Sequence, residues 1–245
     1  MDRRNIRLVI EYDGTNYHGW QRQKNANSIQ ETLESAIQQM TQETVTTTAA
    51  GRTDTGVHAR GQVVNFVLAR KIALSKIMKG INSYLPSDIV VKKVDQVPLD
   101  FNARFDARKR IYQYFVSLER TAIFRKYSWE YFHKINFDLL QEMAALLVGE
   151  HDFAAFVKYQ AQAEHKVCTV HESVWRQENQ FLIYRISANR FLHGMVRGLV
   201  GTMLDVSRGR FSMQQFKKIF NSKDRTRAGV AAPARGLFLE EVFYN

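Results

Sequence analysis

Cysteine, proline and long hydrophobic runs are all scarce in this 245-residue sequence. Its single cysteine, Cys168, excludes an intrachain disulfide. Three prolines and 13 glycines are too few for a collagen-like or low-complexity chain. No stretch approaches the roughly 18 uninterrupted apolar residues of a membrane span, and Met1 to Arg4 lead into an alternating segment, unlike a signal peptide. We therefore expect a folded, soluble and cytoplasmic protein.

Basic residues are in clear excess over acidic ones. The 35 lysines and arginines against 24 aspartates and glutamates give a formal net charge of +11. Such an excess suits a polyanionic partner, because surface cations displace the counterions that condense on phosphates, although solubility alone is an alternative reason for it. Basic and aromatic residues are mixed within the short segment 108–115, which favours RNA over an acidic membrane because unpaired bases stack on aromatic rings.

The first hundred residues predict a β-α-β-β-α-β order. Apolar residues alternate from Ile6 to Tyr12, as in a strand, and Ser28 with Glu31 has the spacing of a capping box before a helical pattern. Further strands are expected at 44–50, 62–68 and 89–97, and a second helix at 74–84. This order matches the ferredoxin-like motif, in which helices cover one face of an antiparallel sheet.

The remainder of the chain partly repeats that order. We expect a strand at 108–118, a helix at 137–148 behind Asn136, strands at 169–177 and 181–188, a helix at 191–206, a short helix behind Ser212 and a strand at 237–244. The predicted fold is α+β, with two ferredoxin-like halves at 1–105 and 106–245, the second with insertions. We expect them to form one antiparallel mixed-order sheet with flanking helices and a central basic cleft.

The segment 51–59 (GRTDTGVHA) lies between two predicted strands and presents Asp54 on a loop. Glycines on both sides permit unusual backbone angles, so the carboxylate can be held on a rigid turn. Asp and Gly are also ordinary turn residues, which leaves a purely structural turn open. Arg52, His58 and Arg60 surround the aspartate with polar groups, as is typical of a functional site.

This segment resembles the catalytic motif of the TruA family of tRNA pseudouridine synthases, and the resemblance extends along the whole chain. The matching blocks, in the order of the family, are Glu11 to Gln23, Gln30 to Glu34, Gly51 to Ala59, Phe101 to Phe105, Arg110 to Tyr114, Gly149 to Phe153, Phe191 to Arg197 and Ala232 to Leu237.

The resemblance implies an isomerase that converts uridine to pseudouridine at positions 38, 39 and 40 of the tRNA anticodon stem-loop. Asp54 maps onto the carboxylate that adds covalently to the uracil ring or the ribose, and a carboxylate is a nucleophile at neutral pH. The resemblance also implies that no cofactor or metal is needed. It further implies a homodimer whose two subunits cradle one tRNA.

Three substrate-binding residues follow from the same resemblance, each with a structural alternative. Tyr112 maps onto the active-site tyrosine that lies against the target base, but the pattern alone fits a core tyrosine equally well. Arg197 maps onto the arginine that pairs with Asp54, although a snorkelling arginine at a helix edge is the alternative. Arg52 maps onto the arginine that fills the gap left by the flipped nucleotide, and simple phosphate contact is its alternative.

Parts of the sequence are also compatible with three other functions. Asp54-Thr55-Gly56 is also the aspartic protease tripeptide, but one such loop lacks the second carboxylate of the dyad, and Arg52 favours full ionisation. The spacing of His165, Cys168 and His171, with His151, suggests zinc but lacks paired knuckles. A non-catalytic or retargeted RNA-binding protein of the same fold would not need Asp54.

At three positions the sequence departs from the family pattern. Cys168 stands where arginine is common, which leaves any tRNA contact of that arginine in doubt. Thr55 stands where alanine is usual, and Ser207 where glycine is usual. The last two touch no proposed catalytic atom.

Overall fold

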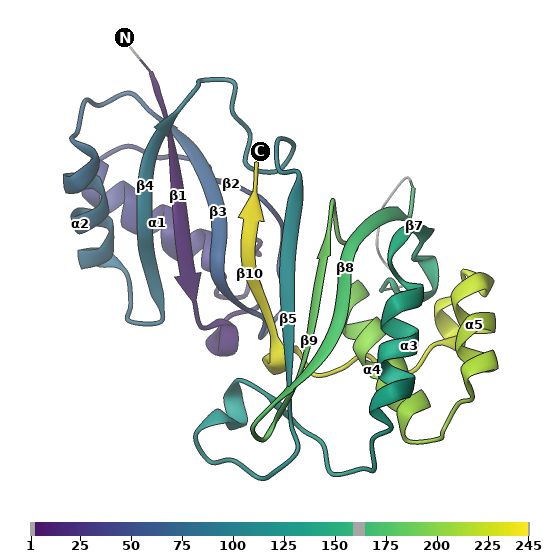
Figure 1. The fold of residues 1–245 in the computed structure, drawn as a ribbon. Helices are drawn as coiled ribbons and strands as arrows, with labels where there is room; N and C mark the ends of the chain where they lie inside the picture. Colours follow the sequence, from purple (N-terminus) through teal and green to yellow (C-terminus); the bar gives the residue numbers. More distant parts are fainter. Residues whose placement is uncertain (1–2, 159–164, 245) are drawn as a thin grey trace. The chain divides into compact units, whose positions relative to one another are not determined.

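The structure, a computed structural model, describes residues 3–158 and 165–244 (Figure 1). Helices and antiparallel strands both contribute to it, which confirms the α+β class predicted from the sequence. Residue contacts divide the chain into two compact units, 1–108 with 239–245 and 109–238. The C-terminal segment 239–245 thus belongs with the first unit. The division predicted from the sequence, 1–105 and 106–245, places this segment in the second half. In the described residues no helix has the length and apolarity that crossing a bilayer requires.

The first unit has a ferredoxin-like strand order. Strand β1 runs between β3 and β4 and is antiparallel to both, and the short β2 pairs with β3. Strand β10 lies beside β3 as well. The elements are β1 (Arg4–Tyr12), α1 (Ile29–Thr41), β2 (Thr48–Ala49), β3 (His58–Leu68), α2 (Leu74–Tyr84), β4 (Ile89–Val97) and β10 (Leu237–Phe243).

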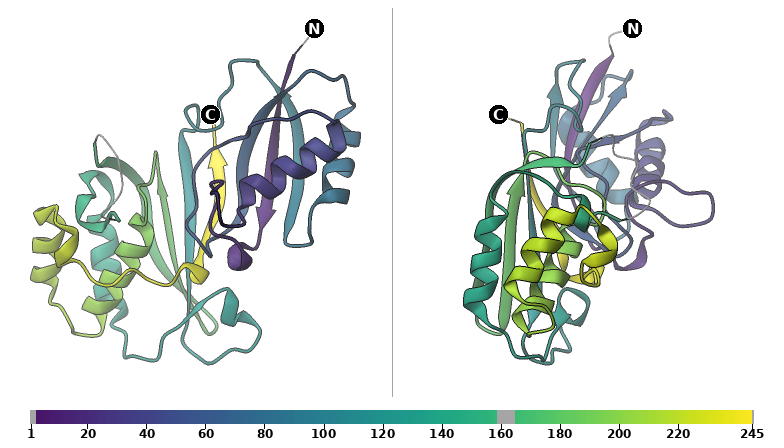
Figure 2. Two further views of the ribbon diagram at one scale, coloured as in Figure 1. Left: turned by 180° about the vertical axis from the view of Figure 1, so that it is seen from behind. Right: turned by 90° about the vertical axis from the view of Figure 1, so that its right-hand side faces the viewer.

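Helices cover one face of this sheet, and the chain after β4 contacts the other face at one end of β1. Ile6, Leu8 and Ile10 are completely buried on one face of β1, as their alternation predicts, and α1 lies across the strands in Figure 2 while contacting α2. On the opposite face, the Nδ2 atom of Asn5 donates to the Phe101 carbonyl over 2.8 Å. The segment that follows β4 is therefore fixed against the sheet.

The strand expected at 44–50 is wrong for most of its length, because only Thr48 and Ala49 pair with β3. The backbone N–H of Thr47 donates instead to the buried Glu34 carboxylate over 2.7 Å. A residue that gives its N–H to a side chain cannot use it in a strand ladder, so the β-prone composition of 44–47 is overridden by a tertiary contact.

In the second unit the strands follow the order β5-β9-β8-β7, all antiparallel, with the short β6 parallel to β5. Helix α3 contacts β8 and α4, and α4 contacts α5. The elements are β5 (Lys109–Ser117), β6 (Trp129–Glu130), α3 (Phe137–Leu146), β7 (Gly149–Asp152), β8 (Val167–Glu178), β9 (Phe181–Ala188), α4 (Met195–Ser207) and α5 (Met213–Ser222).

Helix α4 is the buried centre of the second unit. A Cβ on Gly201 would lie 1.9 Å from the Val230 carbonyl oxygen, and one on Gly198 would lie 2.6 Å from that of Phe156. These glycines permit the close backbone approach predicted from the sequence. The helix begins at Met195 and not at Phe191, because Gly194 takes a φ of 75° and interrupts the helical backbone.

Candidate functional site

Asp54 lies on the loop between β2 and β3, half-buried, whereas Arg52 is exposed. Gly56 takes a φ of 76°, a conformation that favours glycine, and the Val57 N–H donates to the Asp54 carbonyl over 3.1 Å. The loop thus makes a tight turn immediately after the aspartate. The turn chemistry is that expected from the sequence.

The segment between β1 and α1 supports this loop along its length. The Trp20 N–H donates to the Thr53 carbonyl over 3.0 Å, and the Gly56 N–H donates to the Tyr17 carbonyl over 3.3 Å. Gly14 lies so close to the loop that a Cβ there would be 2.0 Å from the Val57 carbonyl oxygen. Two backbone contacts and one close approach therefore fix the loop on either side of Asp54.

Buried side chains brace the loop from below. The hydroxyls of Tyr12 and Thr53 lie 2.8 Å apart, and Gln62 Nε2 donates to the Gly51 carbonyl over 2.7 Å. Burial raises the pKa of Tyr12 to about 12, so its hydroxyl is neutral at physiological pH. The sequence predicted strands at Tyr12 and Gln62 and included Tyr12 in a matching block, but it predicted a supporting role for neither. Polar residues at buried strand positions were the signal that could have identified them as supports.

His58 and Arg60, whose polarity suggested a site, have structural roles. The buried His58 ring places Nδ1 3.1 Å from the backbone nitrogen of Gly14 and 3.1 Å from Asp13 Oδ1. Arg60 pairs with Glu240 of β10 over 3.1 Å. His58 thus ties the first turn after β1 to β3, and Arg60 ties β3 to β10.

Glu34 of α1 is a buried carboxylate that links three segments near the loop. It accepts hydrogen bonds from Thr47 N over 2.7 Å and from Gln30 Nε2 over 3.0 Å, and Arg22 Nη2 lies 2.5 Å from its second oxygen. Its side chain is 5% exposed. Glu34 lies in a block that resembles the family, but the sequence predicted no role for it.

Glu34→Gln is expected to lower the free energy of unfolding by about 1–3 kcal/mol, because the amide keeps one acceptor oxygen and turns its NH2 group either toward Arg22 or toward the donors of Gln30 and Thr47. Urea denaturation of the full chain measures the change. Glu11→Gln, which alters a half-exposed ion pair with Lys92, is the matched control and should change stability by less than about 1 kcal/mol. Equal losses in the two variants would contradict a bracing role for Glu34.

Tyr112 lies on β5 in the second unit and is buried. Its ring meets that of Phe191 edge to face at a centroid distance of 4.9 Å. Arg110, two residues earlier, donates from Nη1 to the Asn189 carbonyl over 2.6 Å. The matching blocks that contain Tyr112 and Phe191 are therefore in contact.

Arg197 lies in the first turn of α4 and is half-buried. Its Nε donates to the Ala232 carbonyl over 2.7 Å, and the Ala232 N–H donates to the Arg197 carbonyl over 2.9 Å. Tyr114 donates its hydroxyl to the Pro233 carbonyl over 2.8 Å, and burial raises its pKa above the ordinary value. Tyr114 is thus a structural anchor for the segment that contacts Arg197.

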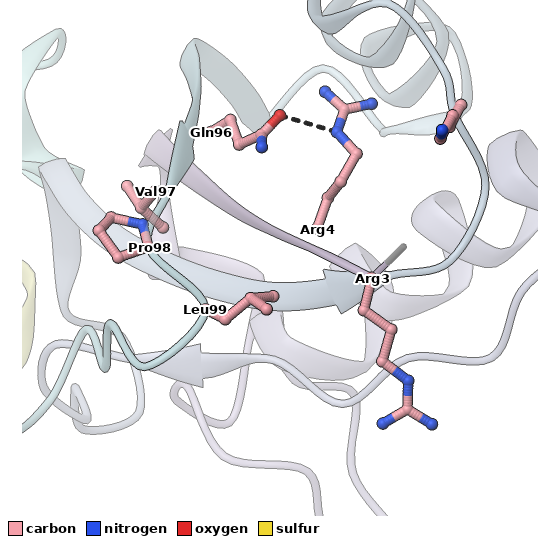
Figure 3. Close-up of a pocket in the computed structure, with 7 residues that line it drawn as sticks. Arg3, Arg4, Gln96, Val97, Pro98 and Leu99 are labelled. Carbon is pink, nitrogen blue, oxygen red and sulfur yellow. Dashed lines mark hydrogen bonds between the residues drawn. The ribbon is translucent and has the colours of Figure 1, made fainter. Parts of the chain in front are cut away.

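A hollow of about 930 Å³ in the first unit is lined by residues at the start of β1 and the end of β4 and by Lys71 (Figure 3). Three of its lining residues are basic, three are apolar and one is Gln96. Arg4 donates there to Gln96 Oε1 over 2.8 Å. At about 3.3 Å per residue, Arg4 and Tyr12 are separated by roughly 26 Å of strand. The hollow therefore lies far from the Asp54 loop, which adjoins Tyr12.

The histidines and the cysteine whose spacing suggested a zinc site do not form a ligand cluster. In the described ranges, no three His, Cys, Asp or Glu side chains gather closely enough to hold a metal. Cys168 is buried opposite His151 in the β7–β8 ladder, and burial raises its pKa to about 11. Its thiol is therefore protonated at physiological pH, which suits a core residue.

Comparison with known proteins identifies the family. A model described as tRNA pseudouridine synthase matches residues 8–106 and 143–245. The tRNA pseudouridine synthase A of Acetivibrio thermocellus is 41% identical over 243 residues, covering 98% of this chain and 100% of the relative. That of Chlorobium luteolum is 42% identical over 242 residues, covering 98% and 96%. The chain belongs to the tRNA pseudouridine synthase family of isomerases.

Proposed function

We propose that this protein isomerises uridine to pseudouridine at positions 38, 39 and 40 of the tRNA anticodon stem-loop, with Asp54 as the catalytic carboxylate. The observation that carries the proposal is the support of the Asp54 loop, whose backbone is held by Tyr17 and Trp20 and whose base is braced by Tyr12. A half-buried aspartate on a loop fixed in this way is pre-organised for a positioned chemical step.

The reaction breaks the bond between uracil N1 and ribose C1′ and forms one between uracil C5 and C1′. Asp54 either adds to the uracil ring or attacks C1′ as the N1 bond breaks. On the ribose route it leaves C1′ when C5 bonds there, and on the ring route it leaves the ring when C5 loses its proton and the ring double bond returns. The proton on C5 is then removed, and N1 gains one, so the product is an isomer of the substrate. The overall conversion has no net redox change.

Tyr112 and Arg52 serve the bound nucleotide in this proposal. The buried ring of Tyr112, steadied by Phe191, offers a flat apolar surface for the target base. The exposed guanidinium of Arg52 lies two residues from Asp54 and can fill the gap left in the stack when the uridine is flipped. Both roles derive from the family resemblance.

The test is to incubate unmodified tRNA with the full-length protein and to map pseudouridine by carbodiimide labelling and primer extension. Stops corresponding to positions 38, 39 and 40 are expected. Tight tRNA binding without any stop would instead favour a non-catalytic RNA-binding protein of the same fold, and stops elsewhere would show a retargeted enzyme.

Arg197→Ala is expected to lower turnover by about 100-fold or more while tRNA binding is largely kept, because we propose that the guanidinium keeps Asp54 ionised and aimed. Single-turnover kinetics and filter binding with the same tRNA measure the two effects separately. Arg197→Lys keeps the charge and should recover part of the rate. A defect confined to binding would refute the pairing.

We further propose, from the family resemblance, that two copies of the chain form a cytoplasmic homodimer that cradles one tRNA. The net charge of +11 supports the tRNA partner, since phosphates attract such a surface.

A further inference from the structure

A hollow of about 430 Å³ lies at the C-terminal end of α4, and each of its lining residues except one glycine has a basic side chain. Its lining residues are His133, Lys134, Arg208, Gly209 and Arg210. Each of the four side chains can donate hydrogen bonds, and no carboxylate is among them. A Cβ on Gly209 would meet nothing within 4 Å, so the backbone is open here. The hollow therefore presents donors to solvent from two separate segments.

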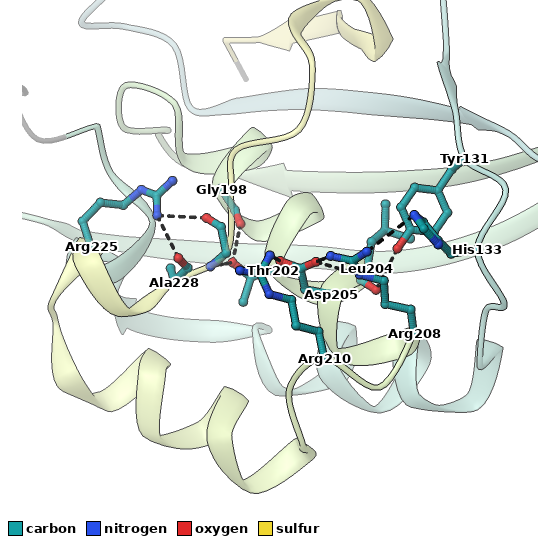
Figure 4. A network of polar contacts seen from close by, with 11 residues as sticks. Tyr131, His133, Gly198, Thr202, Leu204, Asp205, Arg208, Arg210, Arg225 and Ala228 are labelled. Carbon is teal, nitrogen blue, oxygen red and sulfur yellow. Dashed lines mark hydrogen bonds and ion pairs between the residues drawn. The ribbon is translucent and has the colours of Figure 1, made fainter.

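One acidic residue, Asp205, holds the two arginines in place (Figure 4). Arg208 reaches Asp205 Oδ1 with Nη2 over 2.6 Å and with Nε over 3.0 Å, and Arg210 Nη1 reaches Oδ2 over 3.3 Å. The Asp205 side chain is 10% exposed, so it lies behind the arginines. Two arginines and Lys134 against one aspartate leave a formal charge of +2 at the hollow.

The second segment of the hollow is fixed to the end of the helix. Tyr131 donates its hydroxyl to the Leu204 carbonyl over 3.2 Å and packs edge to face on His133 at 5.0 Å. The Ser207 hydroxyl accepts from Asn136 N over 2.8 Å and donates to the Asn136 carbonyl over 3.1 Å. Ser207, where the family usually has glycine, thus ties the two segments together.

Cations at the C-terminal end of a helix often donate hydrogen bonds to its last carbonyls. In α4 the last carbonyls already accept other hydrogen bonds. The carbonyls of residues 204 to 207 accept backbone N–H groups from Arg208, Arg210, Gly209 and Asn136 respectively. The guanidinium and ammonium groups are therefore not needed as caps. Their excess charge is available for an anion.

We propose that this hollow binds a phosphate group of the RNA backbone. The subsite rests on the proposed function, because its ligand is the tRNA that the enzyme modifies. Arginine held in a fixed orientation and a nearby lysine are the groups that recognise phosphate oxygens. The contact positions the RNA and carries no base specificity.

The test compares full-length wild type with the double variant Lys134→Ala/Arg210→Ala, which leaves the Asp205–Arg208 pair intact. Filter binding of unmodified tRNA is measured between about 50 and 200 mM salt. The double variant should bind about tenfold more weakly, and its slope of log K against log salt should be smaller by about 1 to 2. Lys218→Ala, an exposed lysine of α5 outside the hollow, is the matched control and should keep the slope.

Turnover at saturating tRNA is measured in the same samples and should be unchanged in the double variant, since only binding is affected. The subsite is overturned if the double variant keeps the tRNA affinity and the salt slope of wild type. This holds even if calorimetry shows that the double variant no longer binds inorganic phosphate. Wild type that binds tRNA with the expected slope but forms no pseudouridine contradicts the proposed function and leaves the subsite standing.

Discussion

Asp54→Asn should abolish pseudouridine formation, with a loss in turnover on the order of 10⁴-fold or more, as expected when the nucleophile of a covalent mechanism is removed. The amide has nearly the same shape as the carboxylate, so the turn made by Val57 N and the Asp54 carbonyl is kept. It cannot, however, attack carbon or offset positive charge on the ribose. Carbodiimide mapping of tRNA, together with filter binding, separates chemistry from affinity.

Thr55→Ala is the matched control for Asp54→Asn, because it changes an exposed residue of the same turn to the one usual in the family. Its activity should be that of wild type. Product formation by Asp54→Asn at a wild-type rate would remove the carboxylate from the mechanism. Loss of activity in both variants would show that the turn itself is sensitive to substitution.

Gly14→Ala is expected to cost about 3 kcal/mol or more in the free energy of unfolding and to reduce activity sharply. The added Cβ would lie 2.0 Å from the Val57 carbonyl oxygen, a backbone atom that cannot turn away. Relief requires the turn after β1 to separate from the loop that carries Asp54. Urea denaturation measures the first effect, and pseudouridine mapping measures the second.

Gly80→Ala separates this clash from the general effect of adding a methyl group. Its Cβ would also be too close to a neighbour, at 2.5 Å, but that neighbour is Cγ of the flexible Met40 side chain. Alanine also favours the helix α2 in which Gly80 lies, by about 1 kcal/mol. We expect a near-neutral change, and a loss as large as that of Gly14→Ala would contradict the importance of the backbone contact.

Elements with strong local patterns could be predicted from the sequence, and those that depend on distant partners could not. The bounds of α2, β4 and β9 agree with the prediction, and the Ser212–Gln215 capping box forms as expected. Strands β6 and β7 were missed because each is short and is defined by pairing with β5 or β8. Two to four residues carry too little periodicity to be recognised.

The same limit applies to the site. The pattern around Asp54 predicted a glycine-flanked loop, and the family resemblance supplied its role. The supports of the loop join residues far apart in sequence, such as Tyr12 with Thr53 and Glu34 with Thr47. Sequence periodicity describes only neighbours along one element, so it could not bring these pairs together.

The position of β10 has a consequence for synthesis. Glu240 pairs with Arg60, Phe243 accepts from Arg108 N over 2.8 Å, and Tyr244 donates to the Ala103 carbonyl over 2.8 Å, all within the first unit. During translation, residues 109–238 emerge from the ribosome before this strand does. Before β10 has been synthesised, the edge of β3 that β10 pairs with lacks this strand. The first unit therefore stays incomplete while the second unit is being synthesised.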